Sequence, residues 1–437
     1  MTQTSPEEAI TLLRSFLTKN PGTKFFRLQW VDYSGVIRTR IVTRKRCEEF
    51  AAGSDHYSVA GNCLRMAILF IPQYYGEDPQ EWRLCPDWTS LKPCEFAPGH
   101  ASVMCFVAQA EAPDPFARCP RHLLSNVLKQ FQADHQSNFL LGFEIEFVLL
   151  DDELNLVNSL DSIGAYSLTA GLRGRNLIMM EEIVSALEAA GIPVYHFHVE
   201  IPDQLEIALA PLPPMEAIDA YMFAQEAIRA IGIRHEVRVS LAPRPVLKGP
   251  QNGCHVHMSM NPPKSPTAFI EGIMHKMKSL CALGMPTYDS YCRVVEDGAG
   301  LWIGWGHQNR DLPVRRISDN RWELRFADCT SNMYLLMAAV VLAGAAGVTQ
   351  EAKSLRWKDC HKELFGLTEA DLATFGILER MPNSFTAALE AAKRDEDLKK
   401  WIGEEIFTQY VRLKEKEMEA LHTMTDETRR RRSLVFF

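Results

Sequence analysis

Two short segments of this chain carry alternating residues that could bind a cation. Glu144 and Glu146 stand two apart in an apolar stretch, and His255 and His257 stand two apart in a second one. Residues two apart lie on the same face of a β-strand, so each pair would face one side of a sheet. Neighbouring carboxylates repel each other and lose hydration when that side is covered, and a divalent cation relieves both costs. The ordinary alternative for a single Glu-x-Glu pair is a solvated strand face, because Glu is usually exposed.

Further acidic and basic residues share this chemistry. His198, Glu200 and Glu206 follow one another where an alternating segment runs into a turn at Pro202. The stretch from residue 289 to residue 325 then supplies a glutamate and several arginines, namely Arg293, Arg310, Arg315, Arg316, Arg321, Glu323 and Arg325. Carboxylate oxygens and imidazole nitrogens suit Mg²⁺ or Mn²⁺. Arginines gathered around such a cation suit phosphate groups.

Together these residues favour metal-assisted phosphoryl transfer, in which a protein mainly positions groups and neutralises developing charge. The sequence contains neither Gly-x-x-x-x-Gly-Lys-Ser/Thr nor Gly-x-Gly-x-x-Gly. We therefore expect a nucleotide to be held by neither a P-loop nor a Rossmann turn. We interpret His196 and His307 as structural histidines, Arg316 as a solvated neighbour of Arg315, and Cys254 as a small buried apolar residue.

Bulk composition narrows the class of protein. The 437 residues carry a formal net charge of -8 and no basic stripe, which argues against nucleic acid or a membrane as the main partner. We interpret the one basic run, residues 429–432, as a surface or subunit-contact tail, with nuclear targeting as the weaker alternative. The eleven cysteines show no Cys-x-x-Cys spacing, which predicts reduced thiols. The N-terminus resembles a capped helix rather than a signal peptide, and together these features predict a cytoplasmic protein.

The pattern of apolar, turn and capping residues predicts two domains. A small α/β domain, residues 1–113, would contain a hairpin over 25–42 with its turn at 32–35, and the segment at 112–115 would end it. A larger domain, residues 114–437, would contain a strand around Glu144 and short polar strands over 301–327. Its predicted helices cover 121–132, 180–190, 214–231, 266–284, 332–352, 368–375, 385–393 and 398–421. The apolar run 333–348 is too short to span a bilayer and predicts a buried helix.

The order and wording of these motifs resemble the glutamine synthetase superfamily over nearly the full chain. The matching segments are Gly-Phe-Glu-Ile-Glu-Phe at 142–147, His-x-Glu with Pro-x-Gln-x-Glu at 198–206, Gly-Cys-His-Val-His-Met-Ser at 253–259, the arginine-rich block at 309–328 and Asn-Met-Tyr-Leu at 332–335. Each motif is weak alone, and their shared order makes the match specific.

The resemblance implies a role for each matching residue. One metal ion would be held by Glu146, Glu200 and Glu206, and the other by Glu144, His255 and Glu323. ATP would contact His257 and Ser259, while Arg310, Arg315 and Arg321 would hold its phosphates, with Arg310 and Arg315 as the catalytic arginines. Arg293 and Arg325 would hold the carboxylates of an amino-acid substrate.

The implied reaction has two steps, in which a carboxylate takes the γ-phosphoryl group and an amine then displaces phosphate to leave an amide. The implied fold is α+β, with an N-terminal β-grasp domain and a catalytic domain built on a curved antiparallel sheet with flanking helices. ATP and Mg²⁺ or Mn²⁺ are the implied cofactors. A small-molecule acid and an amine are the implied substrates. The implied assembly is a ring-shaped homo-oligomer with active sites at subunit interfaces.

The chain departs from the family where ammonium would bind. The position of the family's flap glutamate is Ala299 or Gly298, and residues 54–58 stand where the family has an Asp-Gly-Ser-Ser loop. Without a gap, Pro250-Gln251 replaces an Asn-Gly pair, although a short gap would match Asn252-Gly253 instead. The segments between Glu200 and Glu206 and between Arg315 and Arg321 are also short.

A desolvated ammonium ion needs carboxylates around it. We therefore expect a ligase that joins glutamate, or a related acid, to an amine other than ammonia. The alternatives are an authentic glutamine synthetase, a catalytically silent structural or regulatory oligomer, and phosphotransfer to a guanidino group on the same scaffold. The clustered ligand positions argue against the silent oligomer, because unpaired carboxylates would destabilise the fold.

Overall fold

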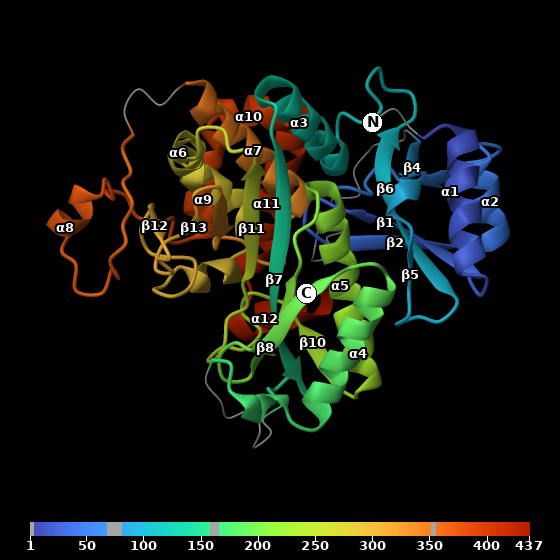
Figure 1. Cartoon of the computed structure of the whole chain (residues 1–437), viewed down its shortest axis with the longest axis horizontal. Coiled ribbons are helices and arrows are strands. Elements are labelled where there is room, and N and C mark those ends of the chain that lie inside the picture. Colours follow the sequence, from blue (N-terminus) through green and yellow to red (C-terminus); the bar gives the residue numbers. More distant parts are fainter. Residues whose placement is uncertain (1–3, 68–80, 158–165, 351–354) are drawn as a thin grey trace.

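The computed structural model describes residues 4–67, 81–157, 166–350 and 355–437, which form two β-sheets and the helices around them (Figure 1). This arrangement confirms the predicted α+β fold. The N-terminal sheet, with its helices, occupies one side of the molecule, and the long strand β7 (Asn138–Leu150) runs through the middle of the larger part (Figure 1).

The N-terminal sheet has the strand order β2-β1-β6-β4-β3, with β5 also paired to β6. Its two central strands, β1 and β6, are parallel, and β1 and β2 form the predicted hairpin around residues 32–35. Gly35 allows the turn, because its φ is +79° and a Cβ there would lie 2.3 Å from the backbone oxygen of Thr330. The elements are α1 Pro6–Lys19, β1 Phe25–Val31, β2 Ile37–Thr43, α2 Arg44–Ala51, β3 Tyr57–Val59, β4 Trp82–Pro86, β5 Lys92–Pro93 and β6 His100–Gln109.

The larger sheet has the order β12-β13-β14-β11-β7-β9-β8, with β10 beside β7. Its central strands pair antiparallel, and only β12 and β13 among the described strands of this sheet pair in parallel. Besides β7, its strands are β8 Val194–Val199, β9 Gln204–Leu209, β10 Arg238–Ser240, β11 Cys254–Asn261, β12 Trp305–His307, β13 Val314–Ser318 and β14 Arg321–Leu324.

Helices flank this sheet, and most lie close to the predicted ranges, although α4 begins at Arg175 rather than at residue 180 and α12 was not predicted. They are α3 Pro120–His135, α4 Arg175–Ala189, α5 Pro214–Arg234, α6 Pro266–Gly284, α7 Met333–Thr349, α8 Glu369–Thr374, α9 Phe385–Lys393, α10 Glu396–Ile402, α11 Glu404–His422 and α12 Asp426–Phe436. The apolar run is the buried helix α7, which begins after Asn332 as its N-cap. Residues 351–352 of that prediction lie outside the described residues.

The C-terminal part differs from the prediction in one helix, and it buries one of four predicted surface arginines. The helix predicted over 398–421 is two helices, because Gly403 has φ +87° and ends α10 before α11 begins. The segment 429–432, predicted to be a surface or subunit-contact tail, lies within α12, and Arg431 and Arg432 are exposed. Arg430 is instead buried and donates hydrogen bonds to the carbonyl oxygens of Pro245 at 2.9 Å and Leu154 at 3.1 Å. These bonds hold the C-terminal helix against the segments that follow β7 and β10.

Candidate active site

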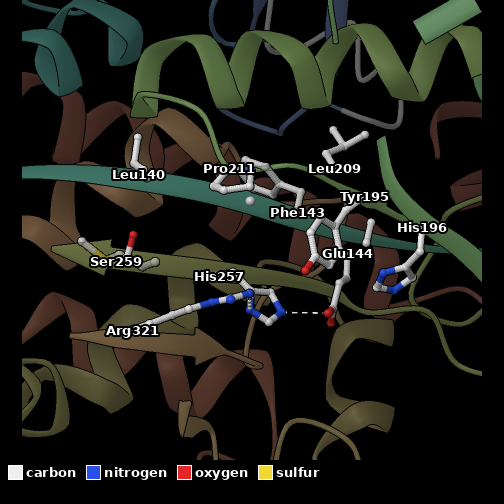
Figure 2. A pocket seen from close by; sticks show the side chains of 13 residues that line it. Leu140, Phe143, Glu144, Tyr195, His196, Leu209, Pro211, His257, Ser259 and Arg321 are labelled. Carbon is white, nitrogen blue, oxygen red and sulfur yellow. Dashed lines mark hydrogen bonds and ion pairs between the residues drawn. The ribbon is translucent and has the colours of Figure 1, made fainter. Parts of the chain in front are cut away.

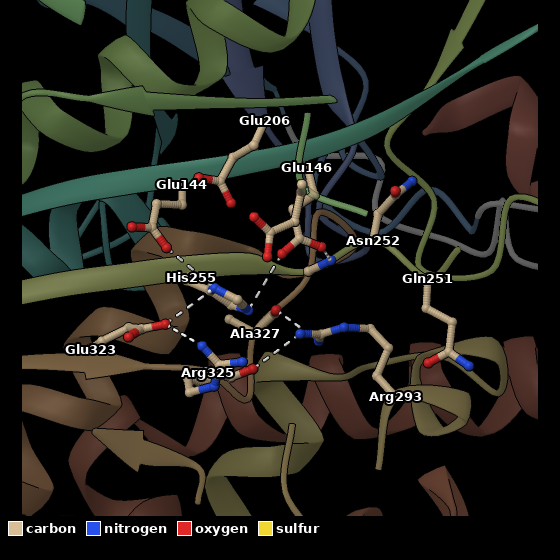
Figure 3. Close-up of polar contacts among 12 residues, drawn as sticks. Glu144, Glu146, Glu206, Gln251, Asn252, His255, Arg293, Glu323, Arg325 and Ala327 are labelled. Carbon is tan, nitrogen blue, oxygen red and sulfur yellow. Dashed lines mark hydrogen bonds and ion pairs between the residues drawn. The ribbon is translucent and has the colours of Figure 1, made fainter. Parts of the chain in front are cut away.

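Neighbouring strands of the larger sheet bring the predicted acidic residues and histidines to one face. Glu146 on β7 pairs directly with Glu206 on β9, and Glu144 pairs with His255 on β11. On the far side of β11, His257 stands opposite Glu323 of β14. Figure 3 shows Glu144, Glu146, Glu206, His255 and Glu323 converging from separate strands on one region. The side-chain period of two thus produces the constellation that the sequence predicted.

Three carboxylates lie close together in one part of this region. They belong to Glu146, Glu200 and Glu206, called the Glu146 set below. Glu146 and Glu206 are 6% and 4% exposed, and Glu200 lies at the turn after β8. Burial, reinforced by the charges of Glu206 and Glu146, raises the pKa of Glu200 to about 7. Such crowding of oxygen ligands fits a hard divalent cation, which would replace the missing counter-charge.

A second group consists of Glu144, His255 and Glu323 and is called the Glu144 set below. In it, the carboxylates of Glu144 and Glu323 flank the imidazole of His255. His255 Nδ1 lies 3.3 Å from Glu144 Oε2 and 3.2 Å from Glu323 Oε1. Burial opposes ionisation of Glu323, but the charges of Arg325 and His255 outweigh it and lower the pKa of this carboxyl to about 2. One imidazole and two carboxylates also fit a divalent cation such as Mn²⁺.

A cavity of about 190 Å³ opens beside the Glu144 set. Its apolar wall includes Leu140, Leu209 and Pro211, and its polar end carries His257 and Arg321, as Figure 2 shows. His257 Nε2 lies 2.8 Å from Glu144 Oε1, and its Nδ1 lies 3.2 Å from a guanidinium nitrogen of Arg321. Ser259 follows on the same face of β11 and also lines the cavity. An apolar wall with a few polar groups at one end is typical of a small-molecule binding site.

The three arginines predicted to hold phosphates lie in three different places. Arg315 donates to Glu323 Oε2 at 2.7 Å, so it lies at the Glu144 set, and Arg321 lies at the cavity. Arg310 lines a second hollow of about 590 Å³, together with Glu296 and Asp297. His307, interpreted as structural, also borders that hollow. The structure therefore brings Arg315 and Arg321 to the cluster and leaves Arg310 at a neighbouring opening.

Arg293 and Arg325 form a linked pair beneath the Glu144 set. Arg293 is 2% exposed and donates to the backbone oxygens of Ala327 at 2.8 Å and Arg325 at 3.0 Å (Figure 3). Arg325 donates to Glu323 Oε1 at 2.5 Å and to the backbone oxygen of Asp297 at 3.0 Å. In this geometry Arg293 positions the segment directly after β14, which carries Arg325, and a direct contact of either arginine with substrate stays a prediction.

The loop at the expected flap position offers no carboxylate to the cluster. Ala299 is fully buried, and a Cβ on Gly298 would lie 2.4 Å from the backbone oxygen of Arg293. Glu296 and Asp297 are exposed and line the Arg310 hollow. A larger side chain at residue 298 therefore requires a different loop conformation.

Two histidines of this region, His196 and His198, have no predicted role. His198 was named only as part of a motif, yet its Nε2 lies 3.1 Å from Glu206 Oε1. His196 was set aside as structural, yet it lines the cavity of Figure 2 and its Nε2 lies 3.9 Å from the same oxygen. The signal was available, because His196, His198 and Glu200 alternate along one segment.

Comparison with known proteins agrees with this geometry. Residues 117–433 match the family described as "Glutamine synthetase, catalytic domain". The chain belongs to the glutamine synthetase family. Members of this family are ATP-dependent ligases that form C–N bonds. The family assignment confirms the predicted resemblance, and the roles of individual residues remain predictions.

Several relatives of this glutamine synthetase family member are similar along most of its length. Glutamine synthetase of Clostridium saccharobutylicum is 26% identical over 424 residues, covering 90% of this chain and 92% of that protein. Gamma-glutamylpolyamine synthetase GlnA3 of Streptomyces coelicolor is 26% identical and covers 91% and 90%. Protein fluG of Emericella nidulans is 29% identical over 96% of this chain, which spans about half, 49%, of that longer protein.

The solved structure of a GmaS/ADP complex has the same fold, with a TM-score of 0.82 at 24% identity, covering 97% of this chain and 99% of the other. None of the helices in the described parts of the chain combines the length and apolar character that crossing a bilayer requires.

Proposed function

We propose that this protein is an ATP-dependent carboxylate–amine ligase that joins glutamate, or a related acid, to an amine other than ammonia. The proposal rests on a contrast between the predicted metal and phosphate ligands, which are present, and the ammonium-binding carboxylates, which are not. The metal-type ligands and two of the phosphate-type arginines converge, whereas the loop at Gly298 and Ala299 presents no carboxylate and leaves no room for one. An acceptor that does not need an anionic pocket suits this arrangement.

The proposed first step transfers the γ-phosphoryl group of ATP to the acid. An oxygen of the substrate carboxylate bonds to the γ-phosphorus, and the bond from phosphorus to the bridging oxygen of ADP breaks. Mg²⁺ or Mn²⁺, held by the Glu146 and Glu144 sets, would supply positive charge beside the phosphates. Arg315 and Arg321 would neutralise the charge that develops on the phosphoryl oxygens, with Arg310 approaching from the neighbouring hollow.

In the proposed second step the amine nitrogen attacks the carbonyl carbon of the acyl phosphate. The C–O bond to phosphate breaks, inorganic phosphate leaves, and the nitrogen loses one proton. Residues 298 and 299 carry no carboxylate, but Glu296 and Asp297, just before them on the same loop, are exposed at the Arg310 hollow and would accept this proton after a movement of the loop. His257 and Ser259 would contact the nucleotide, and the Arg293–Arg325 pair would orient the acid.

One relative supports an acceptor other than ammonia, because it is named a gamma-glutamylpolyamine synthetase. The second candidate is an authentic glutamine synthetase, which the several relatives of that name favour. A silent structural oligomer is the third. We also propose that the protein assembles as a ring-shaped homo-oligomer in the cytoplasm, with a neighbouring subunit's N-terminal domain completing each site.

The test measures phosphate release from ATP with glutamate, Mg²⁺ or Mn²⁺, and a panel of amines that includes ammonia. Mass spectrometry of the product identifies the amide. We expect one or more substituted amines to give the highest kcat/KM. If ammonia is the best acceptor, the protein is a glutamine synthetase, and if neither Mn²⁺ nor an ATP analogue binds in calorimetry, the silent oligomer is favoured. A phosphorylated product without an amide would indicate guanidino phosphotransfer.

A further inference from the structure

We infer that His196, His198 and Glu206 form an additional cation site, which takes a transition-metal ion such as Zn²⁺ or Co²⁺ in preference to Mg²⁺. The three residues lie on β8 and β9, at the edge of the sheet beside the Glu146 set. The reaction proposed above assigns no role to either histidine, so the inference stands without it.

Strand geometry brings the three ligand atoms together. β8 and β9 are antiparallel, His198 stands opposite Glu206, and His196 lies two residues earlier, after an irregularity in the register. The imidazole rings lie side by side, with centroids 5.3 Å apart and planes 27° apart. The ligand atoms of all three residues lie within 4.8 Å of one another.

The distances between the ligand atoms of these residues are close to those in a metal site. Two ligands of a tetrahedral ion at about 2.1 Å stand about 3.4 Å apart. Glu206 Oε1 is 3.1 Å from His198 Nε2 and 3.9 Å from His196 Nε2, so one gap is slightly short and the other slightly long. Small rotations of exposed or half-buried side chains are enough to equalise them.

The orientation of His198 is fixed as in known metal sites. Its Nδ1 lies 2.9 Å from the backbone oxygen of Val199, to which it can donate a hydrogen bond, and this leaves Nε2 directed at Glu206. Metal-binding histidines commonly donate their second ring N–H to a backbone carbonyl, which selects the tautomer that presents a lone pair to the ion. Tyr166 packs edge-on against the same ring at 5.3 Å and restricts its rotation.

The ligand atoms of His196, His198 and Glu206 determine which cations this site would prefer. Two imidazoles and one carboxylate suit Zn²⁺, Co²⁺ or Mn²⁺, whereas Mg²⁺ prefers oxygen ligands and retains water. The Glu146 set, with its three carboxylates, offers the oxygen-rich alternative nearby. Because Glu206 belongs to both, an ion on the histidines competes for one ligand of the Glu146 set. His196 also lines the cavity of Figure 2, so such an ion would lie at the edge of that cavity.

The test titrates the metal-free, full-length protein with Co²⁺ in the presence of saturating Mg²⁺, and follows the visible ligand-field absorption of Co²⁺. We expect a Co²⁺ equivalent that Mg²⁺ does not displace in the wild type, and its loss in the double variant His196→Gln/His198→Gln. The matched control, His275→Gln/His361→Gln, removes two exposed histidines far along the chain and should retain that equivalent.

The single variant His196→Gln guards against loss of structure, because this side chain is 43% exposed. We expect it to keep the melting temperature and far-ultraviolet circular dichroism of the wild type while weakening Co²⁺ binding at least about tenfold. Unchanged Co²⁺ stoichiometry and affinity in a folded double variant would overturn the inference. Complete displacement of Co²⁺ by Mg²⁺ in the wild type would also overturn it.

Discussion

Glu144 on β7 and His255 on β11 stand directly opposite each other, with His255 Nδ1 3.3 Å from Glu144 Oε2. Burial opposes ionisation of Glu144, but hydrogen bonds from His255 and His257 outweigh it and lower the pKa of this carboxyl. Glu144 is therefore held as a carboxylate at neutral pH, between two imidazoles that can exchange their protons for a metal ion. The pairing across two strands fixes this arrangement before any ligand arrives.

The first prediction concerns the charge of Glu144. The substitution Glu144→Gln keeps the size of the side chain and removes a metal-type ligand, so we expect Mn²⁺ affinity of one site to fall at least about tenfold and ligase activity to fall at least as much. Isothermal titration calorimetry with Mn²⁺ measures the first effect. The exposed Glu153→Gln is the matched control and should bind Mn²⁺ like the wild type. Equal Mn²⁺ binding by Glu144→Gln would remove Glu144 from the ligand set.

The second prediction is a pH dependence of the metal-free protein. The pKa of Glu200 is raised to about 7 by burial and by Glu206 and Glu146, so the folded state binds this proton more tightly than the unfolded chain does. The stabilising effect of protonation is present below the unfolded pKa of 4.5 and is lost as the pH rises through about 7. We expect the melting temperature without metal to fall between pH 5 and pH 8, and Mn²⁺ to restore it.

The variant Glu200→Gln isolates this effect from other titrating groups. At pH 8 without metal we expect it to be more stable than the wild type by about 1 kcal/mol, a value discounted because the side chain is 24% exposed. The difference between the two proteins should vanish toward pH 5. A difference that is independent of pH would show that Glu200 is not crowded by its neighbours.

Much of this site could be predicted from the sequence, because strand periodicity and the order of the family's motifs along the chain indicate which residues belong to it. Alternation placed Glu144 with Glu146, and His255 with His257, on shared faces, and the structure adds the register that pairs Glu146 with Glu206. The bounds of α6, Pro266–Gly284, were predictable from a Pro at the first position and a Gly at the end.

Other features could not be predicted because they depend on contacts between distant segments. The hydrogen bonds from Arg293 to the backbone oxygens of Ala327 and Arg325 depend on how the short 3-10 helix Asp289–Arg293 packs against the segment after β14, and no local sequence pattern predicts this packing. The burial of Arg430 in α12 likewise depends on carbonyl groups of residues far along the chain. A run of four arginines resembles a solvated tail when only its composition is known.

The third prediction tests the pair that supports Glu323. Arg325 donates to both Glu323 Oε1 and the backbone oxygen of Asp297, and the single ammonium of a lysine cannot reproduce this planar fork. We expect Arg325→Lys to lower kcat/KM for the acid at least about tenfold and to weaken Mn²⁺ binding less. Steady-state kinetics with varied acid measures the first effect. Arg316→Lys, at the exposed Asp319 pair, is the control and should change neither quantity appreciably.

The fourth prediction concerns the loop at Gly298 and Ala299, the position at which the sequence predicts the family's flap glutamate to be missing. A Cβ on Gly298 would lie 2.4 Å from the backbone oxygen of Arg293 and 3.0 Å from Val295 Cγ2, so Gly298→Ala must displace the loop. The displacement would disturb the contact between Asp297 and Arg325, because residue 297 precedes the changed position. We expect a loss of about 1–3 kcal/mol in stability and a lower kcat with every amine, measured by urea unfolding and phosphate release. Gly22→Ala has no heavy atom within 4 Å of the added Cβ and serves as the control, which should behave like the wild type. Full activity in Gly298→Ala would show that the loop moves freely during turnover, and that its observed conformation does not set the choice of amine.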